Sequence, residues 1–180
     1  MRKVVLIGTS HKFQISSSQP CSAEAEQFRQ VLRVLCREHT ANALAEELHP
    51  EELECRKVTK SICREVAHEL GLAHQYSDMS DSERKSRDYR HQHEIWVEAN
   101  NSPSTLRGTS QCEIYKLIEP EVRRNHLIKE QYWLCRLQEL DTWPVVFVCG
   151  ADHYEHFALL LGGLSFDVFA AFPDWRPSRT

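Results

Sequence analysis

The sequence predicts an α/β fold with a mainly parallel sheet flanked by helices and a charged helical insertion. Two observations lead to this expectation. Short aliphatic runs alternate along the chain with longer segments whose apolar residues recur at helical spacing. Parallel strands also need crossover connections, and a helix is their usual form. The 180 residues, 41% hydrophobic and 27% charged, suffice for one such domain.

The chain begins with an expected strand, helix and strand. Residues 4–7 form a continuous aliphatic run, which is typical of a strand buried on both faces. Ser22 can cap the helix that follows, because acidic residues occupy its first turn and its apolar residues form one stripe. A second, short strand is expected over 43–48.

The middle of the chain is expected to hold a long helix, a strand and an insertion. One helix is predicted over 50–70, because it begins with proline and keeps helical apolar spacing up to a glycine. A third strand is expected over 72–76. The segment 79–111 is rich in both charges and then polar, so we interpret it as an inserted lobe or flexible flap within a single domain, 1–180.

The last third of the chain returns to the alternating pattern. A long helix is predicted over 120–140, starting near a proline. The clearest strand of the chain, 145–149, comes next, and a short helix over 154–161 ends at two glycines. A final strand is expected over 166–172. These elements complete the predicted sheet.

Charge and cysteine content exclude several classes of protein. The 22 basic and 26 acidic residues give a net charge of −4, so no nucleic-acid partner is expected. The longest apolar runs, such as 145–149, fall far short of the roughly 20 residues of a spanning helix, so no membrane segment is expected. The seven cysteines form no Cys-x-x-Cys pair, which favours a reducing, cytoplasmic location.

Two Gly-x-x-His motifs follow two of the expected strands. They are Gly8-Thr9-Ser10-His11 and Gly150-Ala151-Asp152-His153. Glycine allows a sharp backbone turn, and the histidine three residues later would lie over the edge of the sheet. Ligands of such sheets bind beyond the carboxyl ends of the strands, so we expect the two imidazoles to meet there.

Carboxylates accompany these histidines. Glu46 and Glu47 end the second expected strand, and Asp78 follows the third. Imidazole with carboxylate is the usual donor set of zinc and also suits manganese or cobalt. We therefore expect His11, Glu47, Asp78 and His153 to bind a divalent metal ion. Glu130 is a further candidate, because it falls on the apolar stripe formed by Leu127, Leu134 and Leu137 of the long helix.

The paired motifs and Glu47-Leu48 at an early strand end resemble the TraB/Tiki superfamily, which includes haem-uptake and erythromycin-esterase-like branches. The resemblance implies a Tiki-like α/β fold and a metal-dependent hydrolytic centre; the Tiki branch is a metalloprotease. By position it matches His11 and His153 to the motif histidines and Glu47 to the motif acid. Glu51-Glu52 stands where the TraB pattern has an arginine.

The leading functional hypothesis is a metal-dependent hydrolase acting on a peptide or a small amide or ester. The metal would activate water, and Glu46 or Glu130 would transfer the proton. Arg84 would bind an anionic substrate group or the developing oxyanion.

Two alternatives remain open. The same fold can serve as a non-catalytic module that binds a small ligand or a protein. A Cys–His hydrolase is the other, because Cys149 lies four residues before His153. The sequence contains no Gly-x-Ser-x-Gly, P-loop or Gly-x-Gly-x-x-Gly motif, which disfavours the common serine hydrolases and nucleotide-binding proteins.

Overall fold

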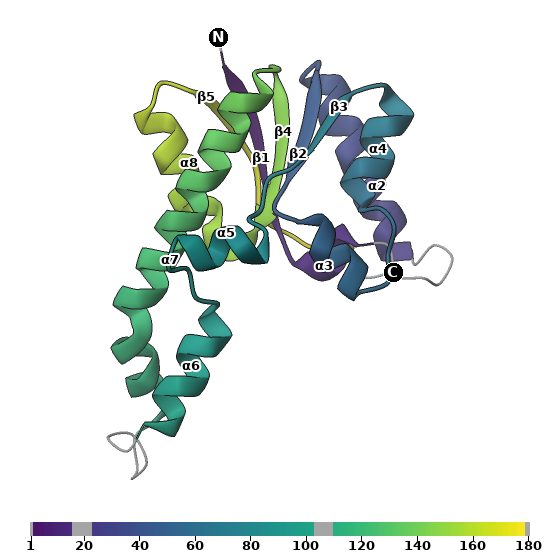
Figure 1. The fold of residues 1–180 in the computed structure, drawn as a ribbon. Helices are drawn as coiled ribbons and strands as arrows, with labels where there is room; N and C mark the ends of the chain where they lie inside the picture. Colours follow the sequence, from purple (N-terminus) through teal and green to yellow (C-terminus); the bar gives the residue numbers. More distant parts are fainter. Residues whose placement is uncertain (1, 16–22, 103–109, 179–180) are drawn as a thin grey trace. The chain divides into compact units, whose positions relative to one another are not determined.

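The computed structural model describes residues 2–15, 23–102 and 110–178 (Figure 1). Ser22, the expected helix cap, and residues 103–109 of the expected insertion lie outside the described residues. The chain forms two compact units. The first consists of Met1–Asp78 with Trp133–Thr180, and the second of Met79–Tyr132.

The first unit contains a five-stranded sheet in the order β3-β2-β4-β1-β5. The strands are β1 (Lys3–Thr9), β2 (Ala43–Glu46), β3 (Ala73–Tyr76), β4 (Val145–Gly150) and β5 (Asp167–Trp175). Every neighbouring pair is parallel. The α/β class and the parallel sheet predicted from the sequence are therefore confirmed. The described residues contain eight α-helices besides.

Helices of the first unit cover both faces of this sheet (Figure 1). On one face, α2 (Ala23–Glu38) and α4 (Ile62–Leu70) pack Phe28 and Val66 into a core with Val5 and Val146 of the sheet. On the other face lies α8 (Tyr154–Gly163). There Phe157 packs against Phe147 of β4 with ring centres 5.0 Å apart. The central strands are thus buried on both sides, as their continuous aliphatic sequences predict.

The prediction of a single helix over 50–70 is wrong. The structure has two helices there, α3 (Pro50–Cys55) and α4. Lys57, after α3, has a φ of 56°, a left-handed conformation that a helix cannot contain. The hydroxyl of Ser61 then accepts a hydrogen bond from the Arg64 amide and caps α4. A local cap therefore outweighs the continuous apolar spacing that suggested one helix.

The long helix begins earlier than expected. It is α7 (Gln111–Leu140), and Pro120 lies inside it rather than in its first turn. The helix begins at a reciprocal cap, because the Ser110 hydroxyl accepts from the Glu113 amide and the Glu113 carboxylate accepts from the Ser110 amide. Within the described residues no helix, α7 included, is long and apolar enough to cross a membrane.

The apolar stripe predicted along α7 is also wrong in part. Leu127 is 49% exposed, whereas Trp133 and Leu137 are fully buried. Glu130 is buried, at 3% exposure. The remaining helices are α1 (His11–Gln14), α5 (Asp81–Ser86) and α6 (Gln92–Asn101), of which α5 and α6 belong to the second unit.

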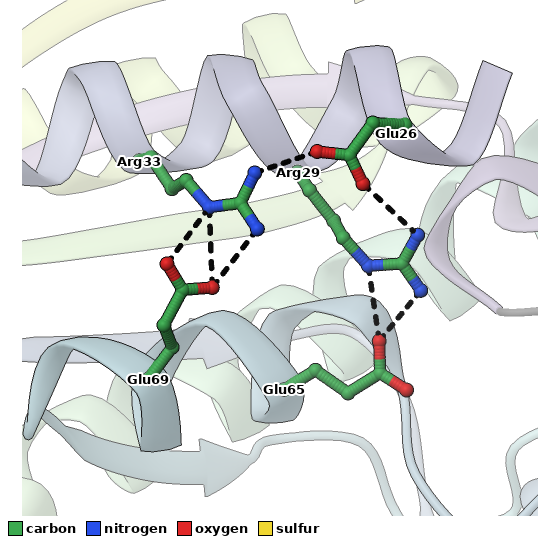
Figure 2. Close-up of polar contacts among 5 residues, drawn as sticks. All are labelled: Glu26, Arg29, Arg33, Glu65 and Glu69. Carbon is green, nitrogen blue, oxygen red and sulfur yellow. Dashed lines mark hydrogen bonds and ion pairs between the residues drawn. The ribbon is translucent and has the colours of Figure 1, made fainter. Parts of the chain in front are cut away.

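A network of five charged side chains joins α2 to α4 on the surface (Figure 2). Glu26 of α2 pairs with Arg29 and Arg33 of the same helix. Arg29 also reaches Glu65 of α4 at 2.7 Å, and Arg33 reaches Glu69 at 2.9 Å. The two helices are therefore held in register by charge as well as by their shared core.

We expect Arg33→Ala to lower stability slightly, and only above acidic pH. The hydrogen bond from Arg33 lowers the pKa of the Glu69 carboxyl, so this pair stabilises the fold when Glu69 is ionised. The stabilisation is lost as the pH falls below about 4, where the carboxyl is protonated. Urea unfolding at pH 7 and at pH 3 measures the difference. Gln30→Ala is the control, because Gln30 is an exposed, uncharged residue of the same helix.

Candidate functional site

The two Gly-x-x-His motifs follow β1 and β4, which are adjacent in the sheet. Thr9 is in register with Gly150 at the carboxyl ends of these strands. After β1 the chain continues to α2, and after β4 it continues to α8 on the opposite face (Figure 1). The sheet order therefore reverses between β1 and β4, and the crevice at such a point is where ligands bind in open α/β sheets.

Each motif histidine is placed by a short helical turn. His11 begins α1, after Ser10 in extended conformation. His153 ends a 3₁₀ turn, η1 (Ala151–His153), which directly follows β4. Gly150 has a φ of −61°, so the sharp, glycine-dependent turn expected at this position is wrong. Glycine is required in both motifs for a different reason, which is that neighbouring atoms pack too closely to leave room for a side chain.

The two imidazoles meet at the carboxylate of Glu47, the residue after β2. Oε1 of Glu47 lies 3.5 Å from Nε2 of His11 and 3.8 Å from Nε2 of His153. Oε2 accepts a hydrogen bond from the amide of Gly150. Glu47 is 1% exposed and the His153 side chain 9%, whereas the His11 side chain is 36% exposed. The cluster is therefore buried on two sides and open to solvent at His11.

Gly150 leaves the space in which this cluster forms. A Cβ atom on Gly150 would lie 3.1 Å from Oε2 of Glu47, 3.4 Å from Nε2 of His11 and 3.7 Å from Cδ2 of His153. All three side chains thus surround one point beside the Gly150 backbone. Any larger residue would fill the centre of the cluster.

The donor types suit a divalent ion, although the ligand atoms of His11, Glu47 and His153 do not all lie within 4.8 Å of one another. The two nitrogen–oxygen distances, 3.5 and 3.8 Å, are long for hydrogen bonds. Neighbouring ligands of a tetrahedral zinc ion lie about 3.4 Å apart when each bond is about 2.1 Å. The carboxylate oxygen therefore stands at nearly a ligand's distance from each imidazole nitrogen. The Gly150 amide, which binds the other oxygen, orients the carboxylate.

A buried tryptophan supports His153. The ring of Trp133 contacts the His153 ring edge-on, with centres 4.9 Å apart, and it also packs against Phe147 and Phe157. The sequence suggests only a packing role for Trp133. Its contact with a site residue has no signature in the sequence, because it depends on how the end of α7 lies on β4.

The neighbouring acid, Glu46, lies elsewhere. Its carboxylate is fully buried and accepts a hydrogen bond from the hydroxyl of Ser61, and it lies 2.8 Å from Nε2 of His74. Consecutive residues of an extended chain point to opposite sides, which explains why Glu46 and Glu47 have different partners. The structure does not bring Glu46 to the two motif histidines.

The other candidates have separate places. The amide of Asp78, a buried residue, donates to the carbonyl of Leu48, so Asp78 lies beside the segment that carries Glu47. Arg84 and Glu130 belong to the second unit. Within that unit Arg84 contacts Nε2 of His91 at 2.7 Å.

Glu130, a candidate from the sequence, has a neighbouring donor, His126, that the sequence-based prediction did not include. His126 and Glu130, one turn apart on α7, have metal-ligating atoms within 4.8 Å of each other. The His-x-x-x-Glu spacing would have identified this pair, since residues four apart share one face of a helix.

The comparisons with known proteins add no assignment to this geometry. The chain matched no family model, no curated protein and no solved structure. What can be said about its function therefore comes from the parallel sheet and from the His11–Glu47–His153 cluster.

Proposed function

We propose that the protein is a metal-dependent hydrolase in which His11, Glu47 and His153 hold one divalent cation: zinc, manganese or cobalt. The observation that supports this most is the position of Glu47 Oε1, within 4 Å of two imidazole nitrogens from opposite ends of the chain. Two imidazoles and one carboxylate are typical ligands of a catalytic zinc site, which keeps a further position for water or substrate.

The side chains have different tasks in this proposal. The Gly150 amide holds Oε2 of Glu47, and Oε1 is the oxygen nearest to the two imidazoles. His153 is fixed by Trp133 and is buried, whereas His11 faces solvent and marks the side from which substrate enters. A cation in this position supplies an ionised water near neutral pH and polarises a carbonyl, which suits a peptide or a small amide or ester.

Other candidate residues have no part in this mechanism. The carboxylate of Glu46 is bonded to Ser61 and His74, which removes it from proton transfer at the cluster. Arg84 and Glu130 belong to the second unit, whereas the proposed mechanism uses only residues of the first unit.

A TraB/Tiki-like relationship belongs to the same proposal. It is supported by the parallel sheet, by the paired Gly-x-x-His motifs at adjacent strand ends, and by the acid between them. The arginine of the TraB pattern has no nearby substitute in this chain. The nearest arginine in the sequence, Arg56, pairs with Glu52 on the surface of α3. The protein would then recognise its substrate without that arginine.

The Cys–His alternative is weaker on structural grounds. Cys149 is fully buried in β4, with 0% exposure. A nucleophilic thiol needs access to the substrate, and burial disfavours the reactive thiolate. The buried surroundings also raise the pKa of the neighbouring Tyr154 hydroxyl.

Metal titration of His11→Ala and His153→Ala tests the proposal. Both variants should bind zinc, manganese or cobalt at least about 100-fold more weakly than the unaltered protein, since each removes a ligand. His68→Ala, an exposed histidine of α4, is the control and should bind normally. His11 is partly exposed, so His11→Ala should fold even if the loss of the His153–Trp133 contact weakens the other variant.

Two results would count against the proposal. Unchanged metal affinity in both variants would overturn the assignment of the ligands. Metal binding without turnover of any amide or ester substrate would overturn the hydrolase and leave a metal-binding module.

A further inference from the structure

A pocket lies in the first unit, between α3, the connection to α4, and the end of β3. Its volume is about 530 Å³, within the usual range for small-molecule sites. Its apolar wall contains Leu53, Val58 and Tyr76. Leu53 belongs to a small buried cluster with Leu48, and Val58 and Tyr76, both partly buried, pack against that cluster.

Two cations also line the pocket. Lys57 and Arg64 form no ion pair with a carboxylate among the described residues, and Glu54 is the single acid of the lining. This differs from Arg29, Arg33 and Arg56 of the surrounding helices, which all pair with glutamates. Positive charge is therefore available to a ligand here.

Tyr76 contacts one of these cations. The guanidinium carbon of Arg64 lies 5.8 Å from the centre of the Tyr76 ring, within the distance of a cation–π contact. The Tyr76 hydroxyl is buried and has no hydrogen-bond partner in the described part of the chain. The part of Tyr76 that lines the pocket is therefore its ring rather than its hydroxyl.

We propose that this pocket binds a small ligand that joins an aromatic or other apolar group to an anionic group, either carboxylate or phosphate. Arg64 and Lys57 bind the anion, and Leu53, Val58 and the Tyr76 ring contact the apolar part. A guanidinium pairs with either anion through two parallel hydrogen bonds. This site is independent of the proposed metal centre, because it shares none of its residues.

Titration with three probes tests the proposal: phenyl phosphate, benzoate and neutral benzyl alcohol. We expect saturable binding of at least one of the two anions. The anion that binds with higher affinity identifies the anionic group that the pocket prefers. Arg64→Gln should weaken this binding at least about 10-fold, because a charged hydrogen bond is lost. Lys57→Gln should weaken it less, since its ammonium acts as a single point charge.

The control variants separate the two sites. Arg56→Gln changes an arginine that does not line the pocket, and it should bind the anions normally. His11→Ala should bind them normally too, even though metal binding is lost. Absence of saturable anion binding, equal binding of benzyl alcohol, or unchanged affinity in Arg64→Gln would each overturn the proposal.

Discussion

Replacing Glu47 with glutamine is expected to weaken metal binding strongly, whereas the same change at the adjacent Glu46 should leave it intact. Glutamine keeps the size of the side chain, and its carbonyl can still accept the Gly150 amide. It then turns an uncharged NH₂ group toward His11 and His153, where the ion needs an anionic oxygen. Isothermal titration with zinc should show at least about 100-fold weaker binding.

Glu46→Gln is the matched control for this change. Both glutamates are buried, but Glu46 bonds to Ser61 and His74. Its replacement should lower the free energy of unfolding by about 1–3 kcal/mol, because a charged hydrogen-bond acceptor is lost in the interior. If Glu46→Gln lost metal and Glu47→Gln kept it, the two roles would be exchanged and the proposed centre would be wrong.

The second large effect is expected at Gly8, where alanine should destabilise the whole fold. A Cβ on Gly8 would lie 2.0 Å from the carbonyl oxygen of Pro173 in β5, and a backbone atom cannot move aside as a side chain does. β5 is the edge strand and pairs with β1, so the clash would push β5 away from β1. We expect a loss of about 3 kcal/mol or more, measured by urea unfolding.

Gly150→Ala is the counterpart in the other motif. Its Cβ would press on side chains, Glu47 and His11, at 3.1 and 3.4 Å. Small side-chain shifts relieve this pressure, so stability should fall much less than in Gly8→Ala, while metal affinity should fall at least about 10-fold. Equal destabilisation by the two alanines would contradict this difference between the motifs.

The strands could be predicted from the sequence because their signals are local. Continuous aliphatic runs at 4–7 and 145–149 lie within β1 and β4, and a strand-to-helix turn placed His11 and His153 beyond them. Parallel order then brings both histidines to one edge of the sheet. The convergence of these residues thus follows from topology alone.

The remaining features depend on packing that the sequence does not show. Glu46 and Glu47 are both glutamates, so the sequence does not distinguish their roles. The direction of each side chain depends on where β2 ends. The break between α3 and α4 depends on a left-handed residue, Lys57, for which the apolar spacing gave no indication. In α7, Leu127 continues a helical apolar spacing but is exposed, because neighbouring elements bury Trp133 and Leu137 instead.

The sheet order has a consequence for biosynthesis. β4 inserts between β1 and β2, although both are made long before it. Until β4 has left the ribosome, His11 and Glu47 have neither His153 nor the Gly150 amide beside them. If the proposed metal centre exists, a nascent chain that ends before β4 would capture no metal there, and metal uptake during translation would report the moment at which the central strand closes the sheet.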